Sequence, residues 1–218
     1  MGKLLLRITS AIVGISVLFG TVAAAETLEL IQLPTPKVEG GKPLMQVLKN
    51  RNSSRSFSPG DVPLQVLSNL LWAAFGINRP ESGKRTAPSA VNWQEIDIYV
   101  ATAGGLYLYD AKGNKFLRIL SEDIRALTGR QSFVKEAPVN LIYVADFSRM
   151  TGTSQEDKDF YSAADVGFIS ENVYLFCSSE GLSTVVRGSI ERTALAKAMK
   201  LRPEQKIILA QTIGYPKK

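Results

Sequence analysis

Residues 157–180 read DKDFYSAADVGFISENVYLFCSSE and form the longest helical segment that the sequence predicts. Gly181 follows directly, as is typical of the residue after a helix. The apolar side chains are spread nearly all round this helix: Tyr161, Ala164, Phe168, Ile169, Val173, Leu175 and Phe176. A helix of this kind is buried on several sides. In a chain of 218 residues, we therefore expect a central helix or one at a subunit interface.

Shorter helices and strands are predicted around this segment from apolar spacing and from Gly and Pro positions. Helices are expected at residues 44–50, 64–75, 121–129 and 190–199. Strands are expected at residues 95–101, 106–109, 115–119, 139–145, 183–187 and 206–213, and a polar loop at 78–92. This mixture predicts an α+β fold, with a mixed or antiparallel sheet flanked by helices.

The N-terminal residues 1–25 have the pattern of a secretory signal peptide. Lys3 and Arg7 precede an apolar run that ends in small residues, before Glu26. The run is also nearly long enough for a membrane anchor, which is the alternative. We expect cleavage after Ala25 and export, most simply to the periplasm. Residues 26–41 then form an extended arm, and residues 42–218 form one domain without an integral membrane segment.

Composition excludes several kinds of chemistry. The sequence has no histidine, which removes His-based triads and most zinc or copper sites. Cys177 is the only cysteine, so no intramolecular disulfide forms, and its apolar neighbours predict a buried thiol. The net charge of +6 is not gathered on one element, which argues against a nucleic-acid partner. Chemistry must come from other side chains or from a cofactor.

Two segments carry candidate ligand-binding groups. The first holds Arg51, Asn52, Ser53 and Arg55, and guanidinium and hydroxyl donors of this kind suit a phosphate. A solvated basic loop is the alternative. The second segment, residues 88–92, contains Pro88, Ser89, Ala90 and Asn92, and would otherwise be an ordinary surface turn.

Taken in order, these motifs resemble the nitroreductase family. They are RNSSRSF at 51–57, LLWAAFGI at 70–77, RTAPSA at 85–90, DVGFISENVYL at 165–175 and IGYP at 213–216. The resemblance covers about residues 42–216 and is closest to the branch of azoline-forming peptide dehydrogenases. It implies an α/β sandwich that forms a homodimer through the long helix, with Gly167 permitting close approach. Two FMN molecules would lie at the interface, each touching both subunits.

The resemblance also implies roles for residues. Arg51 and Ser53, with Asn52 beside them, would hold the FMN phosphate, and Arg55 would approach the ribityl chain or the pyrimidine edge. Pro88, Ser89, Ala90 and Asn92 would line the isoalloxazine edge. The Gly188 backbone N–H would lie near flavin N5. Arg187 would bind an anionic substrate or point to solvent. Residues 91–95 read VNWQE, without the proline that many members have, which puts the substrate side in doubt.

The implied activity is ping-pong hydride transfer through FMN to a small organic or peptide-derived acceptor. No side-chain acid or base stands out, as expected where the flavin does the chemistry. NAD(P)H is the usual donor in the family, but it is scarce outside the cytoplasm, so an exported protein would use another. Two further readings stay open: a non-catalytic dimer that binds FMN or another small ligand in the cell envelope, and a structural envelope protein. Roles for Lys217 and Lys218 are equally open.

Overall fold

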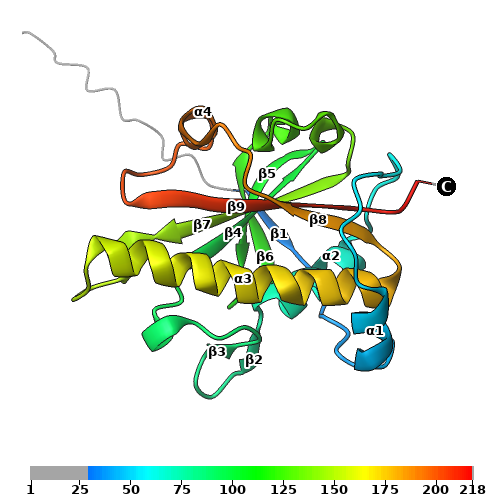
Figure 1. The fold of residues 1–218 in the computed structure, drawn as a ribbon, viewed down its shortest axis with the longest axis horizontal. Helices are drawn as coiled ribbons and strands as arrows, with labels where there is room; N and C mark the ends of the chain where they lie inside the picture. Colours follow the sequence, from blue (N-terminus) through cyan, green and yellow to red (C-terminus); the bar gives the residue numbers. More distant parts are fainter. Residues whose placement is uncertain (1–28, 218) are drawn as a thin grey trace, which may run out of the picture.

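A computed structural model describes residues 29–217, so the expected signal segment lies outside the described residues. One seven-stranded sheet runs through the centre of the molecule, with helices on both faces (Figure 1). Every pair of neighbouring strands is antiparallel. Their order across the sheet is β1 (Leu30–Gln32), β6 (Lys115–Leu120), β5 (Gly105–Asp110), β4 (Ile96–Thr102), β7 (Val139–Asp146), β9 (Gln205–Gly214) and β8 (Ser183–Arg187).

The helices divide between the two faces. One face carries α1 (Leu44–Asn50), α2 (Leu64–Phe75) and the long α3 (Gln155–Glu180) (Figure 1). The other carries α4 (Arg192–Ala198) with the short 3-10 turns η2 (Arg125–Thr128) and η3 (Ser132–Lys135). The α+β prediction is confirmed, and the sheet is antiparallel. Within residues 29–217, every helix is too short or too polar to span a bilayer.

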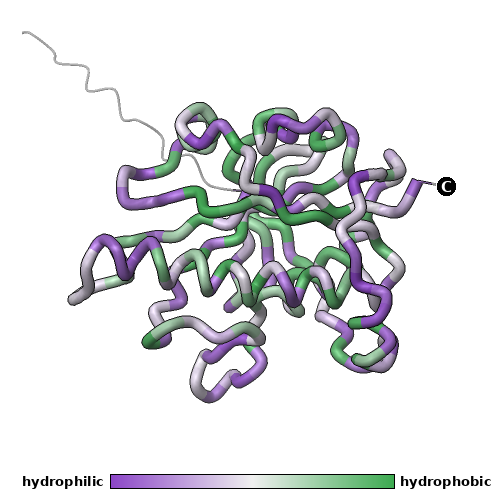
Figure 2. Tube along the Cα trace, in the orientation of Figure 1, coloured by the Kyte–Doolittle hydropathy of each residue, from purple (hydrophilic) through white to green (hydrophobic). Residues whose placement is uncertain are grey.

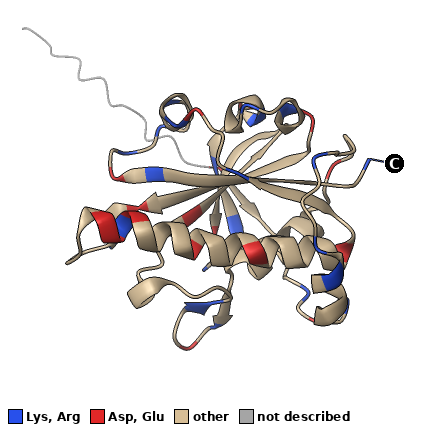
Figure 3. Cartoon of the chain, viewed as in Figure 1, with Lys and Arg blue, Asp and Glu red and all other residues tan. Residues whose placement is uncertain are grey.

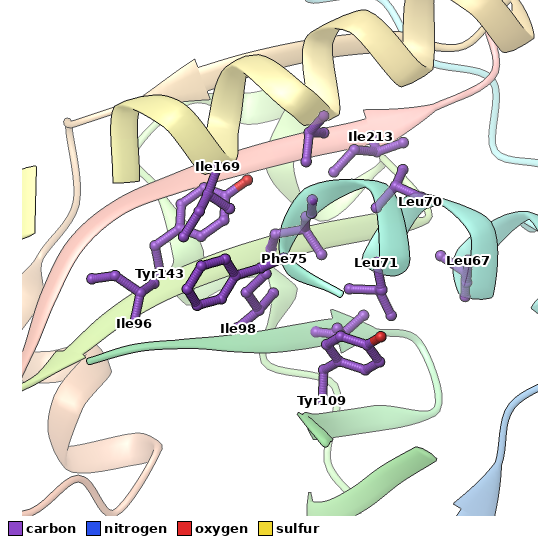
Figure 4. Close-up of a cluster of buried hydrophobic side chains, with 14 of the residues drawn as sticks. Leu67, Leu70, Leu71, Phe75, Ile96, Ile98, Tyr109, Tyr143, Ile169 and Ile213 are labelled. Atoms are coloured by element: carbon purple, nitrogen blue, oxygen red, sulfur yellow. The ribbon is translucent and has the colours of Figure 1, made fainter. Parts of the chain in front are cut away.

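The main core lies between the sheet and the two helices α2 and α3. In Figure 4, Phe75 from α2 and Ile169 from α3 point toward Ile98 and Tyr143 of the sheet, and Leu71 from α2 points toward Tyr109. Strand β7 is buried along its whole length because both of its faces are covered. A smaller cluster, including Tyr99, Ile142 and Leu195, fills the opposite face beneath α4. The green stretches of Figure 2 follow these central strands.

Local signals place the ends of the helices. Pro63 precedes α2, where its fixed φ suits a helix start, and Gly76 follows it. The Ser154 side chain accepts a hydrogen bond from the Asp157 backbone N–H and caps the start of α3. Gly181 ends α3 with φ at 73°, in the left-handed region that glycine tolerates best.

Three expectations about local structure are wrong in detail. Residues 121–129 form only the short turn η2, which ends at Gly129 after four residues. The polar loop at 78–92 contains a small hairpin of β2 (Ile77–Arg79) and β3 (Lys84–Arg85), followed by the turn η1 (Ala90–Asn92). Residues 30–32 of the arm pair with β6 as an edge strand.

The long helix is also less enclosed than its sequence predicts. Ile169, Val173 and Cys177 are fully buried against the sheet, as expected for the thiol. On the opposite side of α3, Phe160 is 66% exposed and Phe168 is 50% exposed. Within one chain, α3 therefore has one buried face and one apolar face open to solvent.

Candidate functional site

Tyr174 on α3 organises the first group of predicted site residues. Its ring lies beneath the Arg51 guanidinium, whose carbon is 5.2 Å from the ring centroid. Its hydroxyl lies 2.8 Å from Oγ of Ser53 and accepts a hydrogen bond from the Val186 backbone N–H at 2.9 Å. Because Val186 already donates to the phenol oxygen, the phenol proton is available to Ser53. Where the phenol donates to Ser53, the Ser53 proton can bind an outside acceptor.

Backbone hydrogen bonds hold the segment that carries these residues. The Arg51 N–H closes α1 by donating to Val47 at 2.8 Å. The Ser54 N–H donates to the Thr184 carbonyl on β8 at 2.9 Å, and the Ser58 N–H donates to Tyr215 at 2.8 Å. Residues 51–58 are therefore fixed between α1 and the last two strands. This placement brings a basic, hydroxyl-rich segment to the edge of the sheet.

The first group is a cationic surface without acidic partners. Asn52, Ser53 and Arg55 are exposed, and Arg51 is half-buried. No carboxylate in residues 29–217 forms a salt bridge with Arg51 or Arg55. Figure 3 shows basic positions at α1 and in the segment that follows it. Beside them, a cavity of about 240 Å³ is lined in part by Asn52, Ser54 and Tyr174. An anion fits these donors.

Gly188 follows β8, only two residues beyond the Val186 N–H that binds Tyr174. It is exposed, and a Cβ atom there would meet only a methyl group of Leu209, at 3.6 Å. Its backbone is therefore accessible to a bound molecule at the edge of the first group.

Arg187 does not lie with these residues, and neither orientation expected for it is correct. Its side chain is only 4% exposed and points to the opposite face of the sheet. Its guanidinium donates to the Thr128 carbonyl at 2.8 Å, to Thr212 Oγ1 at 2.9 Å and to Asn140 Oδ1 at 3.0 Å. Burial lowers the pKa of Arg187 to about 10, so the side chain stays charged at neutral pH. These bonds leave it no role as a ligand for an anionic substrate.

The second group of predicted residues surrounds the loop at 88–94. The Ala90 backbone N–H donates to Oδ2 of Asp165 on α3, at 3.0 Å. Oγ of Ser89 accepts a hydrogen bond from the Gln94 N–H at 2.8 Å and donates to Oε2 of Glu95 at 3.2 Å. Pro88 and Asn92 are exposed beside them, around a cavity of about 230 Å³.

This loop has an unusual backbone. Val91, Asn92 and Gln94 have φ values of 52°, 58° and 49°, in the left-handed region. Such a conformation is uncommon for asparagine and strained for a β-branched valine, at a cost on the order of 1–3 kcal/mol for each such residue. The Gln94 side chain opposes this strain by accepting a hydrogen bond from Arg85 and donating to the Gly83 carbonyl. Val91 meanwhile stays 80% exposed.

A single chain does not bring the two groups together. Tyr174 anchors the first group and Asp165 anchors the second, and both lie on α3. Their separation of nine positions corresponds to about 14 Å along a helix axis. Arg51, Asn52, Ser53, Arg55 and Gly188 therefore gather toward one end of α3. Pro88, Ser89, Ala90 and Asn92 gather toward the other end.

Sequence reasoning missed Tyr174, Glu95 and Asp165 as parts of these groups. Tyr174 and Asp165 lie in the segment interpreted only as helix packing, and Glu95 was placed at the start of a strand. Asp165 and Glu95 are both buried, at 2% and 0% exposed. A charged residue inside an apolar pattern was the one available signal, since such residues are rarely buried without a reason.

Comparison with known proteins gives consistent matches. Residues 48–215 match the model of the nitroreductase family. A protein of Methanocaldococcus jannaschii assigned as a nitroreductase, MJ1384, is 31% identical over 80% of this chain and 92% of its own length. The crystal structure of a protein from Ralstonia eutropha JMP134, also assigned as a nitroreductase, has a TM-score of 0.84. It is 42% identical and covers 90% of this chain and 93% of its own.

A more distant structure shares the fold. It is the FMN complex of a nitroreductase-type protein from Desulfovibrio desulfuricans, with a TM-score of 0.59. The two sequences are 22% identical, and the match covers 82% of this chain and 89% of the other.

Proposed function

Because the chain belongs to the nitroreductase family of flavin-dependent oxidoreductases, we propose that it binds FMN and uses it to reduce or oxidise a small organic or peptide-derived substrate. The observation that carries this proposal is the cationic group around Tyr174. Its arginines form no salt bridge in the described residues, and its Ser53 hydroxyl is exposed beside Tyr174. A phosphate ester is the anion that such donors suit best.

Different residues would bind the phosphate of FMN and its ribityl chain and ring. Arg51, Ser53 and Asn52 would hold the phosphate, and Arg55 would reach the ribityl chain or the ring. The exposed Gly188 backbone would donate toward flavin N5. When bound, FMN supplies the two-electron chemistry, accepting a hydride from a donor and passing it on in a ping-pong sequence.

We infer that a second copy of the chain completes the site. The loop at 88–92 lies about 14 Å along α3 from the phosphate group, whereas its predicted partner is the ring of the same cofactor. The apolar face of α3 with Phe160, Gly167 and Phe168 is open to solvent in one chain. Packing two such faces together would cover apolar surface and place the loop of one copy beside the cationic group of the other.

The substrate class and the location are proposals of the same kind. The motifs favour an acceptor like those of the azoline-forming branch, bound near residues 78–93. Export through residues 1–25 would separate the protein from NAD(P)H, so we propose another electron donor. Rapid, saturable NADPH oxidation by the purified protein at micromolar concentration would contradict that choice.

The direct test is flavin binding. Purified protein is mixed with FMN and desalted, and its absorbance is recorded near ~450 and ~370 nm, where a bound flavin absorbs. We expect stoichiometric flavin, and a dissociation constant raised at least about tenfold by Arg51→Ala, roughly the loss of one charge-assisted contact. Lys112→Ala removes an equal charge from the β5–β6 turn and serves as the control. A protein that stays colourless would sink the oxidoreductase proposal and favour a structural role.

A further inference from the structure

Glu95 and Asp165 form a buried carboxyl pair beneath the loop at 88–94. Glu95 is fully buried and Asp165 is 2% exposed. One carboxyl oxygen of each binds the loop, Oε2 of Glu95 to the Ser89 hydroxyl and Oδ2 of Asp165 to the Ala90 N–H. The remaining oxygen of Glu95, Oε1, is buried without a hydrogen-bond donor among the described residues.

An unsatisfied carboxylate oxygen beside a second carboxylate is costly in a buried site. A proton on Oε1 removes both problems, because it cancels one charge and makes that oxygen a donor to Asp165. The two carboxyl groups hold adjacent residues of the loop, Ser89 and Ala90, so they lie beside each other under it. Burial, reinforced by the Asp165 charge, raises the pKa of Glu95 to about 7.

No basic side chain among the described residues pairs with these two carboxyl groups to neutralise their charge. The Ser89 hydroxyl is the other side-chain group that binds Glu95. The nearby arginines donate hydrogen bonds to Gln94, the residue before Glu95. Arg85 donates to the Gln94 side chain, and Arg149 donates to the Gln94 carbonyl. No salt bridge in residues 29–217 involves Glu95 or Asp165.

We propose that Glu95 and Asp165 share one proton, and that this shared proton holds the strained loop at 88–94 in the shape that receives the flavin ring. The part that concerns the flavin rests on the proposed function. Loss of the proton places two negative charges side by side, and their repulsion displaces the two carboxyl groups together with the loop residues that they hold, Ser89 and Ala90. Glu95 and Asp165 are thus positioning residues, which act through the loop.

Trp93 reports on this loop without any cofactor. Its ring packs edge-on against Tyr161 of α3, with ring centroids 5.9 Å apart. Trp72 is the other tryptophan, so Trp72→Phe leaves Trp93 as the single emitter. The sequence has no histidine, so few other side chains titrate between about pH 5.5 and 8.5.

The experiment records Trp93 emission of the Trp72→Phe protein over this range. We expect one transition near pH 7 that disappears in Glu95→Gln, whose amide imitates the protonated acid. Asp165→Asn should move the midpoint down by about one pH unit, since a like charge is removed. Glu156→Gln, an exposed carboxyl on the first turn of α3, should change nothing. A flat parent titration, or an unchanged midpoint in Asp165→Asn, overturns the proposal even if Glu95→Gln fails to fold.

FMN binding at pH 6 and pH 8 tests the second half of the proposal. We expect the dissociation constant to rise at least about fivefold at pH 8 in the parent and to stay constant in Glu95→Gln. A protein that binds no FMN refutes the proposed function, yet the fluorescence titration still decides whether the pair shares a proton. Tight FMN binding with equal affinity at both pH values refutes the link between pair and loop and leaves the proposed function standing.

Discussion

A guanidinium nitrogen of Arg187 occupies the space that a side chain at position 129 would need. Gly129 follows η2, and its φ of 179° is extended backbone that any residue adopts. The absence of a side chain at this position is therefore required by its neighbours: chiefly the Arg187 guanidinium, with Gln131 Oε1 2.9 Å from where a Cβ atom would lie. The guanidinium in turn caps the Thr128 carbonyl and ties η2 to β7 and β9 through Asn140 and Thr212.

Gly129→Ala should therefore destabilise the protein. The added methyl group must displace a buried charge from its hydrogen bonds, which we expect to cost about 2–4 kcal/mol. Urea unfolding followed by circular dichroism measures the change. Gly60→Ala is the control, because a Cβ there meets only Ser58 Oγ, at 3.8 Å, and should alter stability by less than about 0.5 kcal/mol. Equal stability of the two variants would mean that Arg187 moves aside freely.

Tyr174→Phe should weaken FMN binding more than its loss of one oxygen suggests. The change removes the partner of Ser53 and leaves the Val186 N–H without its acceptor. We expect the dissociation constant for FMN to rise about tenfold and the free energy of unfolding to fall by about 1–2 kcal/mol. Fluorescence quenching of FMN gives the first value and urea unfolding the second. Tyr161→Phe, whose hydroxyl forms no hydrogen bond in residues 29–217, should leave both unchanged.

Gly167→Ala should have opposite effects on the stability of a single chain and on the association of two chains. A Cβ at this exposed position meets nothing within 4 Å, and alanine is favoured over glycine inside a helix by about 1 kcal/mol. A lone chain would therefore become more stable. If α3 packs closely against its copy, we expect the dissociation constant of the dimer to rise at least about tenfold in sedimentation experiments. Unchanged association with a gain in stability would place the dimer contact elsewhere, and Glu156→Ala on the same helix is the control.

The titration of Glu95 should make the free energy of unfolding depend on pH. Because the pKa of Glu95 in the folded protein, about 7, lies above its ordinary value of 4.5, the folded protein binds this proton more tightly than the unfolded chain does. The contribution is full below about pH 4.5 and is lost as the pH rises toward 7, at no more than about 1.4 kcal/mol per pH unit. Glu95→Gln should remove this slope. Urea midpoints of both proteins at pH 5, 6 and 7 give the difference, which would stay constant if Glu95 titrated normally.

Sequence patterns correctly predicted the helices and strands that are determined by residues within or next to them. Pro63 and Gly76 delimit α2 where expected, and the run at 139–145, apolar except for Asn140, is a fully buried strand. Local reasoning failed at residues 121–129, where a four-residue 3-10 turn takes the place of the expected helix.

The placement of site residues depended on contacts that no local pattern contains. Arg187 faces away from Tyr174 because alternate residues of β8 point to opposite faces, and only the sheet order shows what lies on each face. Glu95 and Asp165 are 70 positions apart in the sequence, so their pairing follows from packing α3 against the sheet. The cofactor contacts of Arg51, Ser53, Ser89 and Gly188 stay predictions until flavin binding is measured.

The single thiol of the chain makes the molecule convenient for labelling. Cys177 is fully buried in α3, and burial raises its pKa far above the usual range, so it stays protonated and unreactive toward maleimides. A cysteine introduced at exposed Phe168 or at the exposed loop residue Val91 would therefore be the one reactive sulfur in a natively folded protein. Spin labels or fluorophores at such positions could report distances between two copies without first removing the natural cysteine.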